Sequence, residues 1–373
     1  MKVLIATDKF KGCLTANEVC DAVKEGVLAV DRSAQVETLA LADGGDGSLA
    51  VVQQYTNAKK INCKSRDPLG REITAYYLLE GSRAYVELAV SSGIVLLADD
   101  ERCPMDTSTY GTGQLIMDAI RRGAEEVYLF LGGSCTTEAG LGIATALGVT
   151  CLDSNGQQIL PTGGNLQRIH KISDNKVDEA VRQTTFHIVC DVTNPLYGVD
   201  GAAFVYGPQK GASPSEVVQL DNGLRHVASL LSPYHEDLGT MAGLGAAGGT
   251  ATAMVALFGG GIVSGMDFFT TVTDLDHKIQ SADLIITGEG CIDSQTSAGK
   301  VVSRVAQLGT AHGKPVVAVC GVTTEVTAAD LSLQQIYSVR ERCTTDAESM
   351  TQAYAKLVGI ASDLIRTHIA STF

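Results

Sequence analysis

The spacing of apolar side chains at the start of the chain is typical of alternating strands and helices. Residues 2–7 (KVLIAT) form a short β-rich run, and residues 36–42 form a second one. Between them, Thr15 and Glu18 make a capping box that begins a stretch with apolar residues at helical spacing. A further helix is expected after Gly47. This β-α-β-α start predicts a parallel, doubly wound sheet.

The pattern changes after about residue 60. Residues 59–65, 72–79 and 84–90 alternate between apolar and polar side chains, and turn sequences at 67–70 and 81–82 join them. This alternation predicts antiparallel strands. Because an antiparallel meander does not belong inside a doubly wound sheet, a second domain is expected to begin here.

Buried-strand patterns return towards the C-terminus, at residues 283–288 (DLIITG), 315–320 (PVVAVC) and 336–339, before a long helix from about residue 347. These units resemble the first ones. We therefore predict an α/β protein of two domains. A Rossmann-like domain with a doubly wound parallel sheet, residues 1–60 and 281–373, is interrupted by a mixed α/β domain with antiparallel strands, residues 61–280.

Composition and charge narrow the classes of function. The chain has 28 basic and 42 acidic residues among 373, a net charge of −14 without a dense basic cluster, which argues against nucleic-acid and anionic-membrane partners. The ten cysteines stand singly and the seven histidines lack metal-ligand spacing, so reduced thiols are expected, with neither zinc nor disulfides.

Two segments bear on location. The N-terminus lacks the apolar region of a signal peptide, so a cytoplasmic protein is expected. Residues 238–266 carry no charged side chain, but nine of them are glycine and bulky apolar side chains are sparse. A buried helix flanked by glycine-rich loops is therefore predicted there in preference to a membrane span.

Acidic side chains stand in glycine-rich segments that follow predicted strands: Asp8, Asp43, Asp46, Asp191, Glu289 and Asp293. A single such aspartate is usually a turn or cap residue, but six in comparable places indicate a ligand site at the carboxyl ends of strands. Gly132-Gly133-Ser134 and Gly288-Glu289-Gly290 also follow strands. Their backbone N–H groups could approach phosphate, although the same glycines would suit tight turns.

Two nucleotide-binding motifs fit poorly. No Walker A sequence is present, since Lys300 follows Gly299 but precedes Val301. The segment Gly243-x-Gly245-x-x-Gly248 matches the dinucleotide fingerprint, but no strand is predicted before it. An NAD-linked oxidoreductase therefore remains only a secondary alternative.

The segment from Phe186 to Ala212, FHIVCDVTNPLYGVDGAAFVYGPQKGA, resembles the C-D-x-x-N-P-L-x-G…G-P-Q-K-G-A signature of the glycerate kinase family, the bacterial type I glycerate kinases. Residues 6–12, 42–47, 132–138 and 287–295 resemble four further blocks in family order. The chain departs from the family at two places. It has Thr137-Glu138 where the family commonly has Asn-Asp, and Cys291 where arginine is common.

The resemblance implies a kinase that transfers the γ-phosphoryl group of ATP, with Mg²⁺, to D-glycerate in a cleft between the domains. The 2-phosphoglycerate product is favoured over 3-phosphoglycerate, although no residue pattern decides between them. Glycerate and ATP are the expected partners, without nucleic acid or membrane, and homo-oligomer formation stays open. A second alternative is a non-catalytic sugar-acid or nucleotide-binding protein of the same fold.

The resemblance and the loop positions together assign roles to individual residues. Asp191 and Lys11 are expected to be catalytic, and Glu289 and Asp293 to bind magnesium. Nucleotide binding is assigned to Gly132, Gly133, Ser134, Gly288 and Gly290. Substrate binding is assigned to Asp8, Lys9, Asp43, Asp46, Ser91, Asn194 and Lys210.

Overall fold

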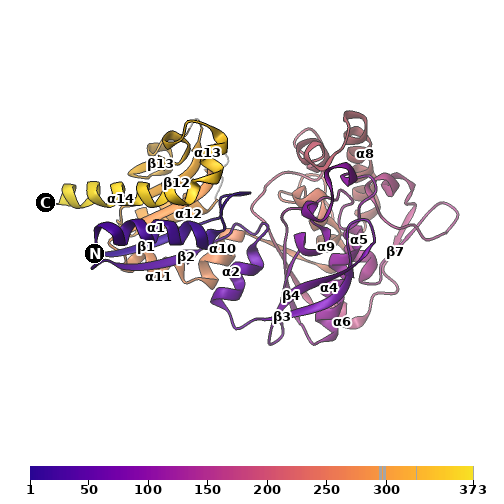
Figure 1. Ribbon diagram of the computed structural model, residues 1–373. Helices are drawn as coiled ribbons and strands as arrows, with labels where there is room; N and C mark the ends of the chain where they lie inside the picture. Colours follow the sequence, from indigo (N-terminus) through magenta and orange to yellow (C-terminus); the bar gives the residue numbers. More distant parts are fainter. Residues whose placement is uncertain (294–295, 297–299, 325, 373) are drawn as a thin grey trace. The chain divides into compact units, whose positions relative to one another are not determined.

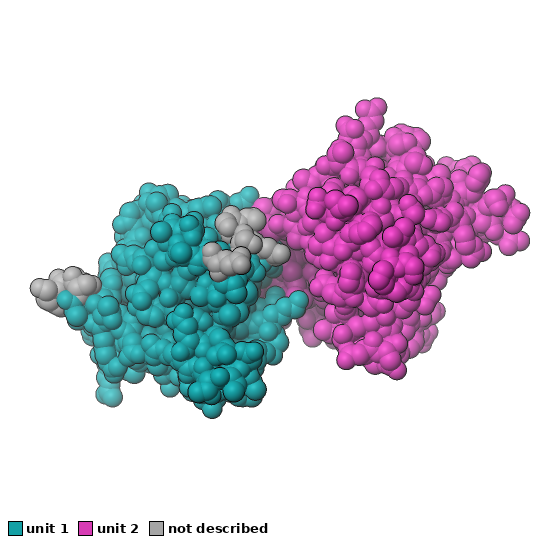
Figure 2. Space-filling view, turned by 90° about the horizontal axis from the view of Figure 1, so that it is seen from above, with its two compact units in different colours: residues 1–43, 266–373 teal, residues 44–265 magenta. Residues whose placement is uncertain are grey.

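The computed structural model describes residues 1–293, 296, 300–324 and 326–372. The chain divides into two compact units. Unit 1 comprises residues 1–43 and 266–373, and unit 2 comprises residues 44–265 (Figure 2). The sequence prediction set the boundaries at 60/61 and 280/281.

Packing explains where the observed boundaries lie. Helix α2 (Ser48–Tyr55) packs against β4 (Glu72–Glu80) and β5 (Arg83–Glu87) of unit 2, although it follows a strand of unit 1. Helix α11 (Leu275–Ser281) packs against β1 (Lys2–Thr7) of unit 1. Helix α2 therefore belongs to unit 2 and helix α11 to unit 1, which the order of elements along the chain did not indicate.

Unit 1 contains a five-stranded sheet in the order β13-β12-β11-β1-β2, and every pair in it is parallel. Its other strands are β2 (Gln35–Ala40), β11 (Leu284–Ile292), β12 (Val316–Thr323) and β13 (Gln335–Ser338). The chain leaves β1 towards β2 and later returns to β11 on the other side of β1. The carboxyl ends of β1 and β11 therefore form the topological switch point, where sheets of this kind bind ligands.

Helices cover both faces of this sheet (Figure 1). On one face, α1 and α14 pack on each other and bury Val23 and Leu357 against Ile5 and Ile286. On the other face, Gly309 of α12 lies close to Val316 and Ile285, where a larger side chain would clash. Besides α11, the α-helices described in unit 1 are α1 (Ala16–Val30), α10 (Gly265–Val272), α12 (Val301–Ala311), α13 (Asp346–Thr351) and α14 (Ala353–Thr372).

Unit 2 contains a six-stranded sheet in the order β10-β9-β6-β5-β4-β3. Strands β3, β4 and β5 pair antiparallel, as predicted, while β5, β6, β9 and β10 pair parallel. A separate two-stranded sheet pairs β7 antiparallel with β8. The further strands are β3 (Lys59–Arg66), β6 (Glu126–Phe130), β7 (Thr150–Leu152), β8 (Lys171–Ser173), β9 (Thr185–Val189) and β10 (Gly261–Val263). The predicted fold class, a parallel sheet interrupted by a mixed one, is confirmed.

The helices of unit 2 enclose a core in which Tyr77, Leu129 and Phe186 are buried. They are α3 (Ala89–Ser92), α4 (Tyr110–Arg121), α5 (Leu141–Ala146), α6 (Glu179–Gln183), α7 (Ala202–Tyr206), α8 (Pro214–Leu231) and α9 (Thr250–Phe258). Helix α9 is the buried helix predicted within residues 238–266. Among the described residues, no helix is both long enough and apolar enough to cross a membrane.

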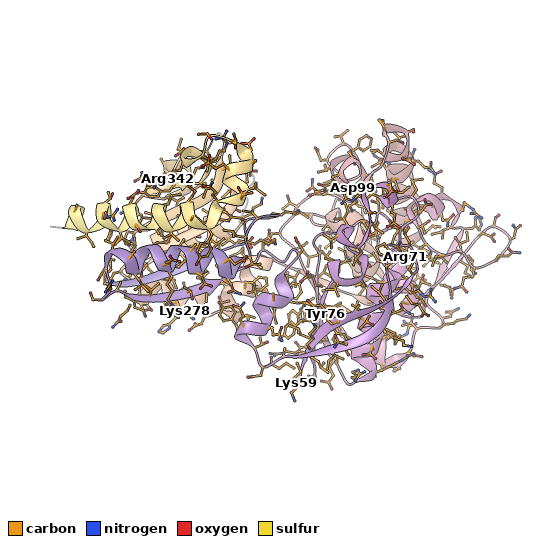
Figure 3. All side chains as sticks on the ribbon, in the orientation of Figure 1. Lys59, Arg71, Tyr76, Asp99, Lys278 and Arg342 are labelled. Carbon is orange, nitrogen blue, oxygen red and sulfur yellow. The ribbon has the colours of Figure 1, made fainter. Side chains whose placement is uncertain are left out.

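Charged side chains join surface elements within unit 1 (Figure 3). Lys278 of α11 forms an ion pair of 2.7 Å with Glu37 of β2. Arg342, just before α13, forms one of 2.7 Å with Asp363 of α14. Both pairs are partly exposed to water, so each is expected to contribute at most about 1 kcal/mol to stability.

Candidate active site

Asp8 follows β1 directly, at the switch point of the sheet in unit 1. Its backbone N–H donates to the carbonyl of Gly288 at 2.8 Å, so the main chain of β11 holds it in place. Its carboxylate accepts a hydrogen bond of 2.6 Å from the N–H of Lys9, and the residue is only 8% exposed. Of the two predicted lysines nearby, Lys9 is half-buried and Lys11 is exposed.

Glu289 lies inside β11, and not in a loop after it as predicted. It is 7% exposed and accepts a hydrogen bond of 2.8 Å from the Thr296 hydroxyl. Burial raises the pKa of Glu289 to about 7, and the negative charges of Asp8 and Asp43 add to this shift. Glu289 is therefore a carboxyl group that can exchange a proton near neutral pH.

Asp8, Asp43 and Glu289 form the carboxylate cluster of unit 1. Their oxygen atoms are the ligand type that Mg²⁺ prefers. Among the described residues, no group of three or more His, Cys, Asp or Glu side chains is arranged to hold a metal ion by itself. The cluster thus fits an ion held by one or two carboxylates together with phosphate oxygens, which is the usual mode for Mg²⁺.

The other predicted metal ligand, Asp293, has different neighbours. Its Oδ2 accepts a long hydrogen bond of 3.7 Å from the Cys291 thiol, and its N–H donates to Thr296 at 3.1 Å. Asp293 is not among the main influences on the pKa of Glu289. Thr296 was not singled out from the sequence, since a hydroxyl that orients a carboxylate has no pattern of its own.

In unit 2, the segment Gly132-Gly133-Ser134 lies just after β6 and packs tightly against two other loops. A Cβ atom on Gly132 would clash with Gly45 and stand 2.6 Å from the Asp46 nitrogen. The carbonyl of Gly133 accepts a hydrogen bond of 2.8 Å from the N–H of Ile94. The structure therefore brings Gly132, Gly133, Ser134 and Asp46 together, as a strand-end loop cluster.

Gly132→Ala is expected to displace this cluster, since its contacts are backbone atoms that cannot move aside. We expect a loss of about 1–3 kcal/mol in the free energy of unfolding and at least tenfold lower catalytic activity. Urea unfolding and initial rates measure the two effects. Gly261→Ala is the matched control, because a Cβ atom there meets open space. Equal behaviour of the two variants would contradict the packing argument.

Lys210 lies beneath the Gly132–Ser134 segment and is not a surface lysine. It is 2% exposed, and its Nζ donates hydrogen bonds of 2.8 Å to Ser134 Oγ and 2.7 Å to the Thr136 carbonyl. Burial lowers the pKa of Lys210 to about 8. Within the described part of the chain no carboxylate is bonded to it, so its charge can act on an anion bound on the loop.

Asp191 follows β9, as predicted, and its carboxylate is bound by two residues of the same unit. Its Oδ1 accepts hydrogen bonds of 2.8 Å from both the Ser264 hydroxyl and the Gly265 N–H.

Both polar atoms of the Asn194 side-chain amide form hydrogen bonds. Its Nδ2 donates to the Asp200 carbonyl at 2.8 Å, and its Oδ1 accepts from the Tyr206 hydroxyl at 2.7 Å.

Three of the predicted site residues lie within helices or strands and not in loops. Ser91 is fully buried and shares a hydrogen bond of 2.9 Å with Thr112. Gly288 and Gly290 lie within β11, so they do not open a helix, and α12 begins only at Val301. A Cβ atom on Gly288 would clash with the Val319 carbonyl, so the strand pairing itself requires glycine there.

Thr137 and Glu138, where the chain departs from the family pattern, lie in the interior of unit 2. Glu138 is completely buried, and its carboxylate accepts hydrogen bonds from the Thr109 hydroxyl at 2.6 Å and the Gly142 N–H at 2.5 Å. Burial raises the pKa of Glu138 to about 7. It joins the starts of α4 and α5, so we assign it a structural role.

The glycine fingerprint also has a packing explanation. A Cβ atom on Gly245 would clash with the Pro195 carbonyl, and one on Gly248 would clash with the Thr136 carbonyl. No strand runs directly into this segment, which forms a short 3₁₀ turn before α9. These glycines allow close approach of backbone to the Asn194 and Lys210 regions, and the strand that a dinucleotide site needs is missing.

Comparison with known proteins reveals extensive similarity. The profile of the glycerate kinase family matches residues 3–369. "Glycerate 2-kinase" of Escherichia coli K12 is 34% identical over 372 residues, 98% of both chains. "Glycerate kinase" of Halalkalibacterium halodurans is 38% identical over 322 residues, 86% of this chain and 85% of that one. A crystal structure of a candidate glycerate kinase 2 from Salmonella typhimurium LT2 matches with a TM-score of 0.83 and 34% identity, covering 100% and 99% of the chains.

Proposed function

The chain belongs to the glycerate kinase family, and we propose that it transfers the γ-phosphoryl group of ATP to D-glycerate with the help of Mg²⁺. We further propose that 2-phosphoglycerate is the product. Support for the 2-hydroxyl comes from the Escherichia coli relative, which is named a glycerate 2-kinase and is similar over 98% of the chain.

The buried Lys210 is the observation that carries this proposal. Phosphoryl transfer has little covalent chemistry for a protein to do, so catalysis depends on positioning and on charge. Ser134 Oγ accepts a hydrogen bond from Lys210 Nζ, so its own proton is free to be donated to a phosphate oxygen. The ammonium group beneath it adds a positive charge that water screens poorly, since the side chain is buried.

The carboxylate cluster of unit 1 provides the second part of the chemistry. Asp8 and Asp43 would hold Mg²⁺, which when bound neutralises charge on the phosphate oxygens. Glu289 would accept the proton of the glycerate hydroxyl, because its pKa of about 7 suits transfer at neutral pH. The hydroxyl oxygen forms the new bond to the γ-phosphorus, the bond to the ADP oxygen breaks, and the proton goes to Glu289.

Asp191 takes a positioning role in this scheme. Two donors bind the same oxygen of its carboxylate, which fixes its orientation. Lys9 and Lys11 stand beside Asp8 in the sequence and would neutralise the glycerate carboxylate or the phosphates. These assignments differ from the sequence prediction, in which Asp191 was a catalytic residue, either the base or a carboxylate on the metal side, and Glu289 was a metal ligand.

The proposal is tested by ADP release from purified protein with D-glycerate, with and without Mg²⁺, followed by phosphorus NMR of the product. We expect Mg²⁺-dependent release of one ADP per glycerate consumed and the signal of 2-phosphoglycerate. The signal of 3-phosphoglycerate would reject only the choice of hydroxyl. Ligand binding without any turnover would favour the non-catalytic alternative and reject the proposal.

A further inference from the structure

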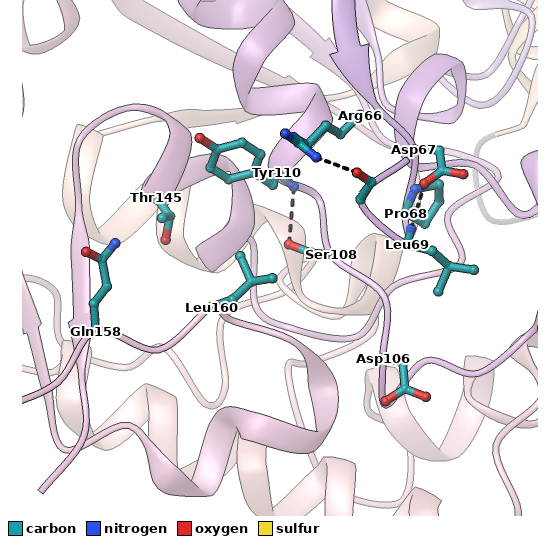
Figure 4. A pocket seen from close by; sticks show the side chains of 11 residues that line it. Arg66, Asp67, Pro68, Leu69, Asp106, Ser108, Tyr110, Thr145, Gln158 and Leu160 are labelled. Carbon is teal, nitrogen blue, oxygen red and sulfur yellow. Dashed lines mark hydrogen bonds between the residues drawn. The ribbon is translucent and has the colours of Figure 1, made fainter. Parts of the chain in front are cut away.

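A cavity of about 450 Å³ lies in unit 2, and none of the residues assigned to the active site lines it (Figure 4). Its walls come from the turn between β3 and β4, the start of α4, the end of α5 and the loop before β8. The turn at residues 67–70, which stood out in the sequence, meets Tyr110 of α4 here. Volumes of about 300–1,000 Å³ are usual for small-molecule sites.

Arg66 provides a positive charge at one side of the cavity. Its Nη1 donates a hydrogen bond of 2.6 Å to the Gly70 carbonyl, and it forms no ion pair with any residue that the structure describes. The neighbouring Asp67, by contrast, is neutralised. Its carboxylate accepts from the guanidinium of Arg71 and from the N–H of Leu69 at 3.0 Å. Within the described part of the chain, no acidic side chain neutralises Arg66, so its charge can interact with a bound anion.

Ser108 provides a donor on the cavity floor. It is 6% exposed, and its oxygen accepts a hydrogen bond of 3.3 Å from the Tyr110 N–H. Its hydroxyl proton has no acceptor within the described part of the chain. Ser108 lies just before the first turn of α4, a helix of 12 residues whose N-terminus carries partial positive charge. Donor, helix end and guanidinium all favour an anion.

Apolar side chains form the rest of the opening. Leu69 and Leu160 are 37% and 55% exposed, and both line this cavity. Asp106, the other acidic residue of the lining, is exposed and lies apart from Arg66 and Ser108 (Figure 4). The ligand that fits is therefore negatively charged at one end and has a short carbon chain.

We propose that this cavity is a second ligand site, which binds a small organic anion through Arg66 and Ser108 while its carbon chain lies between Leu69 and Leu160. The anionic group is a carboxylate or a phosphate. The site is independent of the kinase chemistry proposed above, because it shares no residue with it.

The test uses methyl NMR of the full chain with labelled leucines, titrated with butyrate, propyl phosphate and the neutral 1-butanol. Leu69 and Leu160 methyl signals report on this cavity alone. We expect saturable shifts with at least one of the two anions, and the anion that causes them identifies the head group. Arg66→Gln should weaken that binding at least tenfold. Arg121→Gln, which changes an exposed arginine at the C-terminal end of α4, should leave the binding unchanged.

Three results would overturn the proposal. The methyl signals could stay unmoved by both anions, they could respond to 1-butanol as strongly as to the anions, or Arg66→Gln could bind as well as the parent chain. Ser108→Ala gives a second reading if Arg66→Gln disturbs the turn that Gly70 helps to form, and it too should weaken binding. Glycerate phosphorylation by Arg66→Gln should remain within twofold of the parent rate, which separates this site from the active site.

Discussion

Lys210→Met is expected to lower kcat/KM for ATP by about 100- to 1,000-fold, the usual loss when one buried donor to a developing anion is removed. Methionine has a similar length, so it fills the space of the lysine stem without supplying a charge. Ser134 Oγ and the Thr136 carbonyl both lose the donor that Nζ provides. Initial rates at varied ATP concentration measure the effect, and Lys176→Met, at an exposed lysine of unit 2, is the control.

The pH dependence gives an independent reading of the same residue. Its pKa of about 8 lies below the ordinary value of 10.5, so the ammonium group is lost as pH rises through about 8. We therefore expect kcat/KM for ATP to fall above pH 8 in the parent chain, and this decline to be absent from the residual activity of Lys210→Met. Unchanged activity in the variant would reject the role of Lys210 in phosphate binding.

Stability should move in the opposite direction. Because the pKa of Lys210 is lower in the folded chain, the unfolded chain binds more protons between pH 8 and 10.5, and the free energy of unfolding increases with pH in that window. At pH 7 the buried charge therefore costs stability. Lys210→Met should keep or raise Tm at pH 7, which distinguishes lost catalysis from lost folding.

Glu289→Gln is expected to lower kcat by about 100-fold or more, because glutamine cannot accept the proton of the acceptor hydroxyl. The amide keeps the size of the carboxyl group and can still accept the hydrogen bond from Thr296. The loss should therefore appear in kcat with a small change in KM for glycerate. Steady-state rates at pH 8 give both constants.

The same substitution should stabilise the fold at alkaline pH. The pKa of Glu289, about 7, is raised above the ordinary 4.5, so its contribution to stability is complete below pH 4.5 and is lost as pH rises through 7. At pH 8 the parent chain holds a buried carboxylate near Asp8 and Asp43, and the variant does not. We expect a higher Tm for Glu289→Gln at pH 8 and a smaller difference at pH 5.5.

Asp191→Asn distinguishes the role of Asp191 from the role of Glu289. An asparagine in place of Asp191 weakens the contacts to Ser264 and Gly265, so this variant should lower Tm as well as activity. If Asp191→Asn lost all turnover at unchanged Tm while Glu289→Gln remained active, the proton acceptor would be Asp191, which is one of the two catalytic roles open to it in the sequence prediction.

Local patterns along the chain were enough to predict the type of fold. Apolar runs such as residues 2–7 and 284–288 are too long and too uniform for half-exposed strands, and they proved to be paired in parallel inside unit 1. The alternation at residues 59–65 and 72–79 likewise matched an antiparallel pair. Periodicity reports which faces of an element are buried, so it reveals the sheet type without any knowledge of long-range contacts.

The family, too, could be identified from short blocks of sequence, and the comparison over residues 3–369 confirms it. The same blocks located Gly132, Asp191 and Lys210 without indicating what surrounds each of them. The resemblance and its loop position made Lys210 a candidate for contact with substrate. Its burial depends on Ser134 and Thr136, which lie 76 and 74 residues earlier in the chain.

The amino-acid sequence by itself therefore determined the strand and helix types, the two-domain organisation as a prediction, and the family. Only the tertiary structure decided which side chains are buried, which are bonded, and which carboxyl group titrates near neutral pH. The reason is physical: strand and helix periodicity are local properties, whereas the pKa of Glu289 depends on desolvation and on Asp8 and Asp43, some 281 and 246 positions away. Residues so far apart along the chain become neighbours only when β1 and β11 pair in the folded sheet.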